Sequence, residues 1–109
     1  MPQDARMNDW SMKNGYLVEF SQWQPEFAQI QAHADALVLT PAHWELLNFL
    51  RAYFVEFDMA PPMRLLTKAV AMRLGAEKGN SLYLYTLFPD GPAKQACRYA
   101  GLPKPTSCI

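Results

Sequence analysis

The spacing of prolines is the feature that most restricts how this chain can fold. The sequence holds 9 prolines, and four of them, Pro25, Pro41, Pro62 and Pro92, stand where an apolar helical pattern begins. Proline suits the first turn of a helix but interrupts its interior, because its ring removes an N–H donor and clashes with the preceding turn. The chain therefore has to form several short helices separated by turns.

Apolar residues recur at helical spacing after each of these prolines. The expected inward residues of the first helix are Phe27, Ile30 and Ala34, and Thr40 is a natural N-cap for the second. The second helix carries the broadest apolar face and is the expected core helix. Glycines at 75 and 101 end the third and last helices. The expected helices cover 25–36, 41–57, 62–74, 81–88 and 92–100.

The first 24 residues lack helical periodicity and favour a small hairpin. Asn14-Gly15 is a turn signal between a short strand near Met7–Met12 and a strand that alternates through Tyr16–Phe20. We therefore expect a mainly α fold: a compact orthogonal bundle of about five helices, two of them a helix-turn-helix-like pair, with a small N-terminal β-hairpin. The chain is long enough for one domain, divided into a hairpin region (1–24), a helical body (25–101) and a flexible C-terminal arm (102–109).

The charge balance excludes a general nucleic-acid binder. Ten basic residues stand against ten acidic ones, and the isoelectric point is near 6.7, whereas non-specific binding to nucleic acid requires a basic excess. The expected helix pair 41–57 and 62–74 offers Arg64, Lys68 and Arg73 to a groove, so a redox-sensing DNA-binding regulator is kept as an alternative function.

Several other classes of protein find no support in the sequence. No stretch approaches the roughly 20 apolar residues of a membrane span, and the first residues lack a signal-peptide core, so we expect a cytoplasmic protein. His33 and His43 are not spaced as metal ligands, and two cysteines alone cannot complete a tetrahedral metal site. We expect no metal and no cofactor. Neither a nucleotide-binding loop nor a catalytic motif is present, so a self-contained enzyme is not expected.

The C-terminal arm carries one of the 2 cysteines. Gly101 ends the last helix, and Pro103 and Pro105 bias the following residues toward an extended path. Fully extended, the segment from Gly101 to Cys108 spans roughly 23–25 Å. A cysteine on such an arm can enter the active site of a partner or fold back on its own domain.

The other cysteine, Cys97, allows two interpretations. Ala93, Ala96, Cys97 and Ala100 share one apolar helix face, so Cys97 suits a buried core position. It is also a candidate redox thiol. The candidate catalytic residues are thus Cys108 and Cys97. Basic side chains near a thiol lower its pKa, and the candidates for this supporting role, or for contact with a partner, are Lys94, Arg98 and Lys104.

The motifs around these cysteines resemble the DsrC/TusE family of sulfur-carrier proteins. The resemblance runs from Gly15 through most of the chain and is most specific at the C-terminal end. It is carried by Gly15–Leu17, His43–Glu45, Arg64, Lys78–Ser81, Tyr83–Tyr85, Leu87–Pro89, Gly91–Cys97, Ala100–Pro105 and Cys108.

The resemblance implies a sulfurtransferase-like carrier. In the family the penultimate cysteine carries sulfur as a persulfide, which implies that Cys108 is the acceptor. A second cysteine eleven positions earlier marks the DsrC branch, associated with dissimilatory sulfur metabolism, and implies that Cys97 is the resolving thiol. The TusE branch relays sulfur toward tRNA thiolation and typically keeps only the last cysteine.

The family also implies partners for a monomeric carrier. These are a sulfur-transfer complex of the DsrEFH/TusBCD type as donor, and dissimilatory sulfite reductase downstream. In the alternative within the family, the downstream partner is a tRNA 2-thiouridylase.

Overall fold

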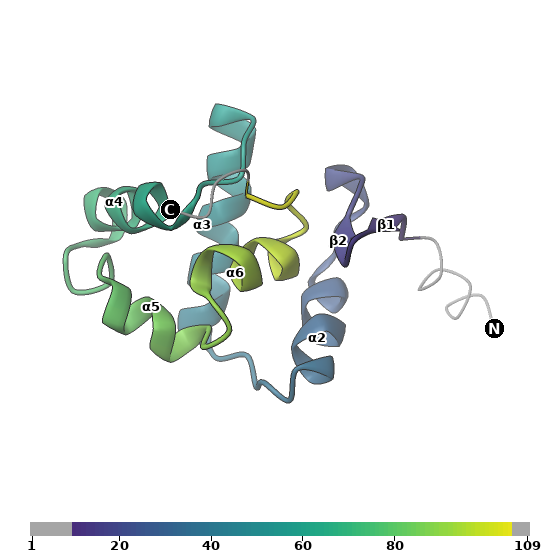
Figure 1. Cartoon of the computed structure of the whole chain (residues 1–109), viewed down its shortest axis with the longest axis horizontal. Coiled ribbons are helices and arrows are strands. Elements are labelled where there is room, and N and C mark those ends of the chain that lie inside the picture. Colours follow the sequence, from purple (N-terminus) through teal and green to yellow (C-terminus); the bar gives the residue numbers. More distant parts are fainter. Residues whose placement is uncertain (1–9, 106–109) are drawn as a thin grey trace.

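Helix α6 lies at the centre of the computed structural model, which describes residues 10–105 (Figure 1). The elements in order are β1 (Met12–Lys13), β2 (Tyr16–Leu17), the 3-10 helix η1 (Phe20–Gln22), α2 (Pro25–Ala34), α3 (Pro41–Phe57), α4 (Met63–Leu74), α5 (Ser81–Leu87) and α6 (Pro92–Ala100). The predicted mainly α fold with five α-helices and an N-terminal hairpin is confirmed. No helix among the described residues has the length and apolar character needed to cross a membrane.

The helices begin where the sequence indicates. Proline occupies the first turn of α2, α3 and α6, and the side chain of Asn80 caps α5 by accepting a hydrogen bond from the Tyr83 N–H at 2.9 Å. At the start of α3, His43 Nδ1 accepts from the Thr40 N–H at 3.0 Å, so its Nε2 carries the proton and donates to the Leu87 carbonyl at 2.8 Å. The buried His43 thus ties α3 to the end of α5.

The hairpin is shorter than predicted. Its turn at Asn14-Gly15 is confirmed, with Met12 paired to Leu17 and Lys13 to Tyr16. The expected continuation of the second strand to Phe20 is wrong, because Phe20 enters η1 and its ring packs against the guanidinium of Arg51, 3.7 Å away. Residues 7–9 of the expected first strand lie outside the described residues.

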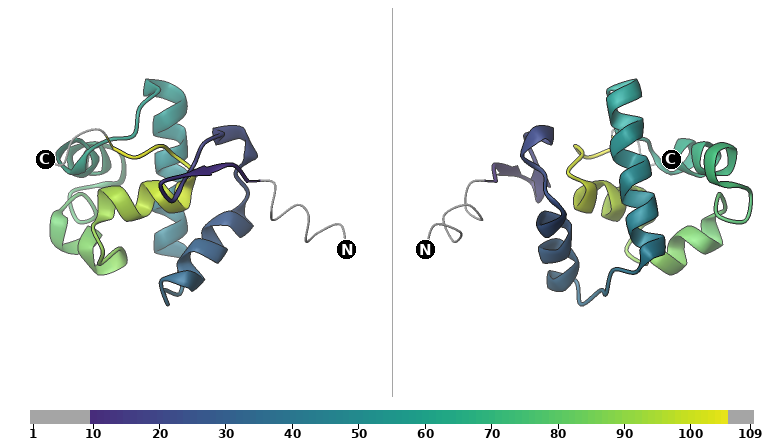
Figure 2. Two further views of the ribbon diagram at one scale, coloured as in Figure 1. Left: turned by 45° about the vertical axis from the view of Figure 1, so that its right-hand side comes forward. Right: turned by 180° about the vertical axis from the view of Figure 1, so that it is seen from behind.

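Helix α2 turns a different face to the core than expected. Phe27 is buried as predicted, but Ile30 and Ala34 are exposed, and Ala28 and Ala32 are buried in their place. The reason is packing: α2 lies against α6 (Figure 2), and small side chains allow the two helices a close approach.

The core surrounds α6 on several sides. Helices α2, α3, α4 and α5 all contact it, and the predicted apolar face of Ala93, Ala96, Cys97 and Ala100 is buried. Gly101 ends the helix in the left-handed conformation with φ 78°, and the Leu102 N–H donates to the Cys97 carbonyl at 3.0 Å. Leu102, which the sequence interpretation assigned to the arm, is completely buried among core residues. The packed core therefore extends one residue beyond Gly101.

This burial predicts a large cost for shortening Leu102. The Leu102→Ala variant should lose about 2–5 kcal/mol of unfolding free energy, the usual range for a core leucine, measured by urea denaturation. Pro103→Ala, at an exposed neighbouring position, is the control and should stay within about 0.5 kcal/mol of wild type. Equal stabilities of the two variants would contradict the core position of Leu102.

Candidate functional site

Cys97, the described member of the cysteine pair, is sealed inside the molecule. It lies in the last half of α6 and exposes none of its surface. Burial raises the pKa of its thiol to about 12, so the thiol is protonated at neutral pH. In this arrangement Cys97 has the properties of a core residue, and a reaction at its sulfur requires the covering groups to move.

The hairpin is one of the covering groups. The Tyr16 phenol lies near Cys97: burial first, and then the negative charge that Cys97 carries when it is deprotonated at high pH, raise the pKa of Tyr16. The turn glycine Gly15 lies beside the aliphatic stem of Arg98. The hairpin therefore covers α6 on the side of Cys97 and Arg98.

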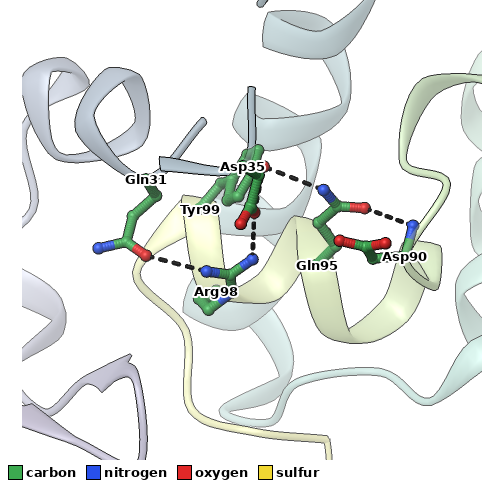
Figure 3. A network of polar contacts seen from close by, with 6 residues as sticks. All are labelled: Gln31, Asp35, Asp90, Gln95, Arg98 and Tyr99. Carbon is green, nitrogen blue, oxygen red and sulfur yellow. Dashed lines mark hydrogen bonds and ion pairs between the residues drawn. The ribbon is translucent and has the colours of Figure 1, made fainter. Parts of the chain in front are cut away.

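Arg98 is engaged in a polar network between α2 and α6 (Figure 3). Its guanidinium forms an ion pair with Asp35 and donates to Gln31 Oε1 at 3.2 Å. The Tyr99 hydroxyl also donates to Asp35, at 2.7 Å, and Gln95 Nε2 donates to that hydroxyl at 3.0 Å. Arg98 is thus held by a carboxylate, and burial is the cause of the raised pKa of Cys97.

The network sets the protonation of its members. Burial alone would raise the pKa of Asp35, but the hydrogen bonds from Tyr99 and Arg98 outweigh burial and bring this pKa below its ordinary value. Burial and the hydrogen bond to Asp35 together raise the pKa of Tyr99 to about 12. At neutral pH the network therefore contains a carboxylate, a guanidinium and a neutral phenol.

This network predicts a pH-dependent contribution to stability. The Asp35 carboxyl has a lower pKa in the folded protein than in the unfolded chain, where it is near 3.8. Its ionised form therefore adds to the free energy of unfolding above pH 3.8, and this contribution is lost as the pH falls through the folded pKa. Asp35→Asn should cost about 1–3 kcal/mol at pH 7, and less near pH 3, in urea denaturation. The exposed Glu56–Arg73 pair offers the control: Glu56→Gln should cost at most about 1 kcal/mol. A loss that is the same at pH 7 and pH 3 would contradict the role of the carboxylate.

The C-terminal end of α6 is fixed by side chains that the sequence interpretation did not single out. Arg51 donates to the Ala100 carbonyl at 2.8 Å and to the Phe20 carbonyl at 3.1 Å, with its guanidinium over the Trp23 ring. Trp23 Nε1 donates to the Tyr99 carbonyl at 2.8 Å. These bonds hold the point from which the C-terminal segment leaves. No local sequence pattern identifies them, since each joins residues far apart in the chain.

The C-terminal segment turns back along α6. Pro103 and Lys104 line a hollow together with the hairpin residues Lys13, Asn14 and Tyr16–Val18. Pro105, the last described residue, is buried and lines another hollow with Met63, Tyr85 and residues 90–94. Of the three basic candidates, Lys104 thus belongs to this segment and Lys94 lies beside it, whereas Arg98 pairs with Asp35. Cys108 lies outside the described residues.

The match to known proteins covers most of the chain. A family model described as DsrC like protein matches residues 7–109. The chain is 53% identical over 95 residues to a protein named sulfurtransferase TusE from Escherichia coli, with 87% of each chain covered.

Solved structures agree in fold and sequence. The NMR structure of DsrC from Allochromatium vinosum matches with a TM-score of 0.83 and 55% identity, covering 92% of this chain and 90% of that one. The crystal structure of the oxidised γ-subunit of dissimilatory sulfite reductase (DsrC) from Archaeoglobus fulgidus matches with a TM-score of 0.73 and 38% identity, covering 92% of each chain. These proteins give the DNA-binding alternative no support.

Proposed function

Because this chain belongs to the DsrC-like protein family, we propose that it is a sulfur carrier that takes up sulfane sulfur as a persulfide on Cys108 and passes it on. The observation that carries the proposal is the extent of the family match, which runs through residue 109 and so includes the arm with Cys108. The folded body then serves to hold and present this arm.

Loading is a thiol-exchange reaction. The Cys108 thiolate attacks the outer sulfur of a donor persulfide, the donor's S–S bond breaks, and the donor leaves as a thiolate while Cys108 becomes a persulfide. A nearby cation favours the attacking thiolate. Our candidates for this cation are Lys104, on the arm itself, and Lys94, which lines the same hollow as Pro105, and three residues beyond Pro105 reach at most about 11 Å.

Release uses the second thiol. The Cys97 thiolate attacks Cys108 Sγ, the persulfide bond breaks, a Cys97–Cys108 disulfide forms and hydrosulfide leaves. The sulfane sulfur is reduced to sulfide and the two thiols are oxidised. Because Cys97 is buried and its pKa is about 12, this step requires a partner or a motion that uncovers it. While Cys97 stays buried it does not attack Cys108, so the persulfide remains on the carrier until delivery.

The two-cysteine reaction belongs to dissimilatory sulfur metabolism. A sulfur-transfer complex of the DsrEFH/TusBCD type would load the carrier, and dissimilatory sulfite reductase would act with it downstream. We expect a monomer in the cytoplasm, where thiols stay reduced.

A second candidate function uses Cys108 alone. The complete burial of Cys97 and the identity to TusE favour a relay in which Cys108 hands its sulfur to a tRNA 2-thiouridylase. Cys97 is then only a core residue.

Mass spectrometry after incubation with glutathione persulfide tests the proposal. One sulfur atom should appear on the Cys108 peptide of wild type and of Cys97→Ser, and none on Cys108→Ser. Sulfur found on Cys97 and absent from Cys108 would refute the assignment. When dissimilatory sulfite reductase is added as the partner that uncovers Cys97, sulfide release from loaded wild type, absent in Cys97→Ser, supports the two-cysteine reaction, whereas equal retention by both supports the tRNA relay.

A further inference from the structure

Three hollows follow one another across the surface around α4. The first lies between α3 and α4, with Phe57 on one side and Met72 on the other. The second lies between α4 and α5 and shares Leu65 and Lys68 with the first. The third, at the start of α6, shares Met63 and Tyr85 with the second. The three hollows thus adjoin one another, and the surface that they occupy together is here called the α4 face.

The α4 face ends where the described chain ends. Pro105 lines the third hollow together with Lys94, and Cys108 is three residues further along the chain. Three residues span at most about 11 Å. A molecule seated at the third hollow of the α4 face therefore binds within about 11 Å of chain length of Cys108.

Apolar side chains stand out from this face. Met72 is 78% exposed, Phe57 50% and Leu65 42%. The rings of Phe49, Tyr53 and Phe57 follow one another along α3 in the first hollow, with the Tyr53 and Phe57 centroids 4.6 Å apart. Exposed apolar groups gathered around a groove are typical of a surface that binds another protein.

The charges on the face have one sign along α4. This helix carries Arg64, Lys68 and Arg73 and contains no carboxylate, although the whole chain is neutral. Arg73 is paired with Glu56, but Arg64 and Lys68 are exposed and have no ion-pair partner within residues 10–105. The complementary surface is one with carboxylates beside an apolar ridge.

We propose that the α4 face is the docking surface for the protein that exchanges sulfur with Cys108, and that this partner presents carboxylates flanking an apolar ridge. The inference rests on the proposed carrier function. A protein partner accounts for the exposed Met72, Leu65 and Phe57, which duplex DNA would leave unused, because DNA is held mainly through its phosphates.

Two pairs of variants separate docking from chemistry. Arg64→Glu combined with Lys68→Glu reverses the unpaired charges, and Met72→Ser removes the most exposed apolar group. The matched controls are Lys13→Glu on the hairpin, at the opposite end of the long axis from α4 (Figure 1), and Val38→Ser, which is 80% exposed between α2 and α3. All these positions are exposed, so the variants should fold.

Calorimetry measures the affinity of each variant for a purified sulfur-transfer complex of the DsrEFH/TusBCD type. Mass spectrometry measures the loading of Cys108 by glutathione persulfide. Each α4 variant should bind the complex about tenfold more weakly, and the wild-type affinity should fall with added salt. The controls should bind like wild type, and every variant should accept sulfur from glutathione persulfide at the wild-type rate.

Unchanged affinity in the α4 variants, or no binding by wild type, would overturn the docking proposal. So would binding to duplex DNA that the double charge reversal abolishes while the affinity for the complex stays the same. Failure of glutathione persulfide to load wild type would refute the carrier function instead. Weakened binding by the α4 variants would then still support the docking surface.

Discussion

Replacing Gly79 with alanine is expected to destabilise the protein by about 3 kcal/mol or more, the upper range for forced overpacking. A Cβ at this position would lie 2.3 Å from both the Cα and the N of Ala71 in α4. Those are backbone atoms, so no change of side-chain rotamer relieves the contact. Either α4 or the turn before α5 has to move, and the packing of Leu66 and Val70 on α4 moves with it.

The effect is measured as the shift of the urea midpoint. Glu77→Ala, at an exposed position in the same turn, is the control and should change stability by no more than about 0.5 kcal/mol. Combining Gly79→Ala with Ala71→Gly removes only the Ala71 Cβ, 2.4 Å from the added atom, so it should restore little. Full recovery in the double variant would show that the contact is not with the backbone.

Cys97 is expected to be at least about a thousandfold less reactive than an ordinary thiol while the protein is folded. Only the thiolate reacts, and each unit of pKa lowers its fraction tenfold; the pKa of Cys97 rises from an ordinary 9.0 to about 12. Burial of the sulfur slows the reaction further. N-ethylmaleimide at pH 8 should therefore modify Cys108 rapidly and Cys97 only as fast as the protein opens.

Urea provides the control for this experiment, since both thiols should react at similar rates once the chain is unfolded. The same raised pKa makes stability depend on pH in the alkaline range. The folded state keeps its thiol proton above the unfolded value of 9.0, so stability should decline as pH rises from 9 toward 12. Equal alkylation of both cysteines in the folded protein would show that Cys97 is accessible at rest.

Local rules predicted the helices well because prolines and glycines determine their ends. The bounds expected for the long helix, Pro41 to Phe57, are those observed, and Gly101 ends the last helix as expected. The prediction of the inward face of α2 was partly wrong, because the smaller Ala28 and Ala32 are buried and Ile30 is exposed. Which face a helix buries depends on how closely its neighbour approaches, and that neighbour is more than 50 residues away in the sequence.

For the candidate site, the burial of Cys97 could be predicted from the sequence, but the polar contacts around it could not. The burial of Cys97 followed from the spacing of its small apolar neighbours. The pairing of Arg98 with Asp35 joins residues 63 positions apart, so no local pattern suggests that this guanidinium is engaged. The roles assigned to Cys108 and Cys97 stay predictions that the persulfide experiments test.

The central position of α6 has a consequence for how the chain acquires its fold during synthesis. Every helix that α6 contacts is made before it, and its contacts with α2 and α3 close long loops, which slows folding. A nascent chain that ends before Pro92 has four helices and no common partner for their apolar faces. Residues 92–102 therefore have to leave the ribosome before the core can form. Until then the apolar faces of the earlier helices are exposed, and either chaperones or rapid completion of synthesis protects them from aggregation.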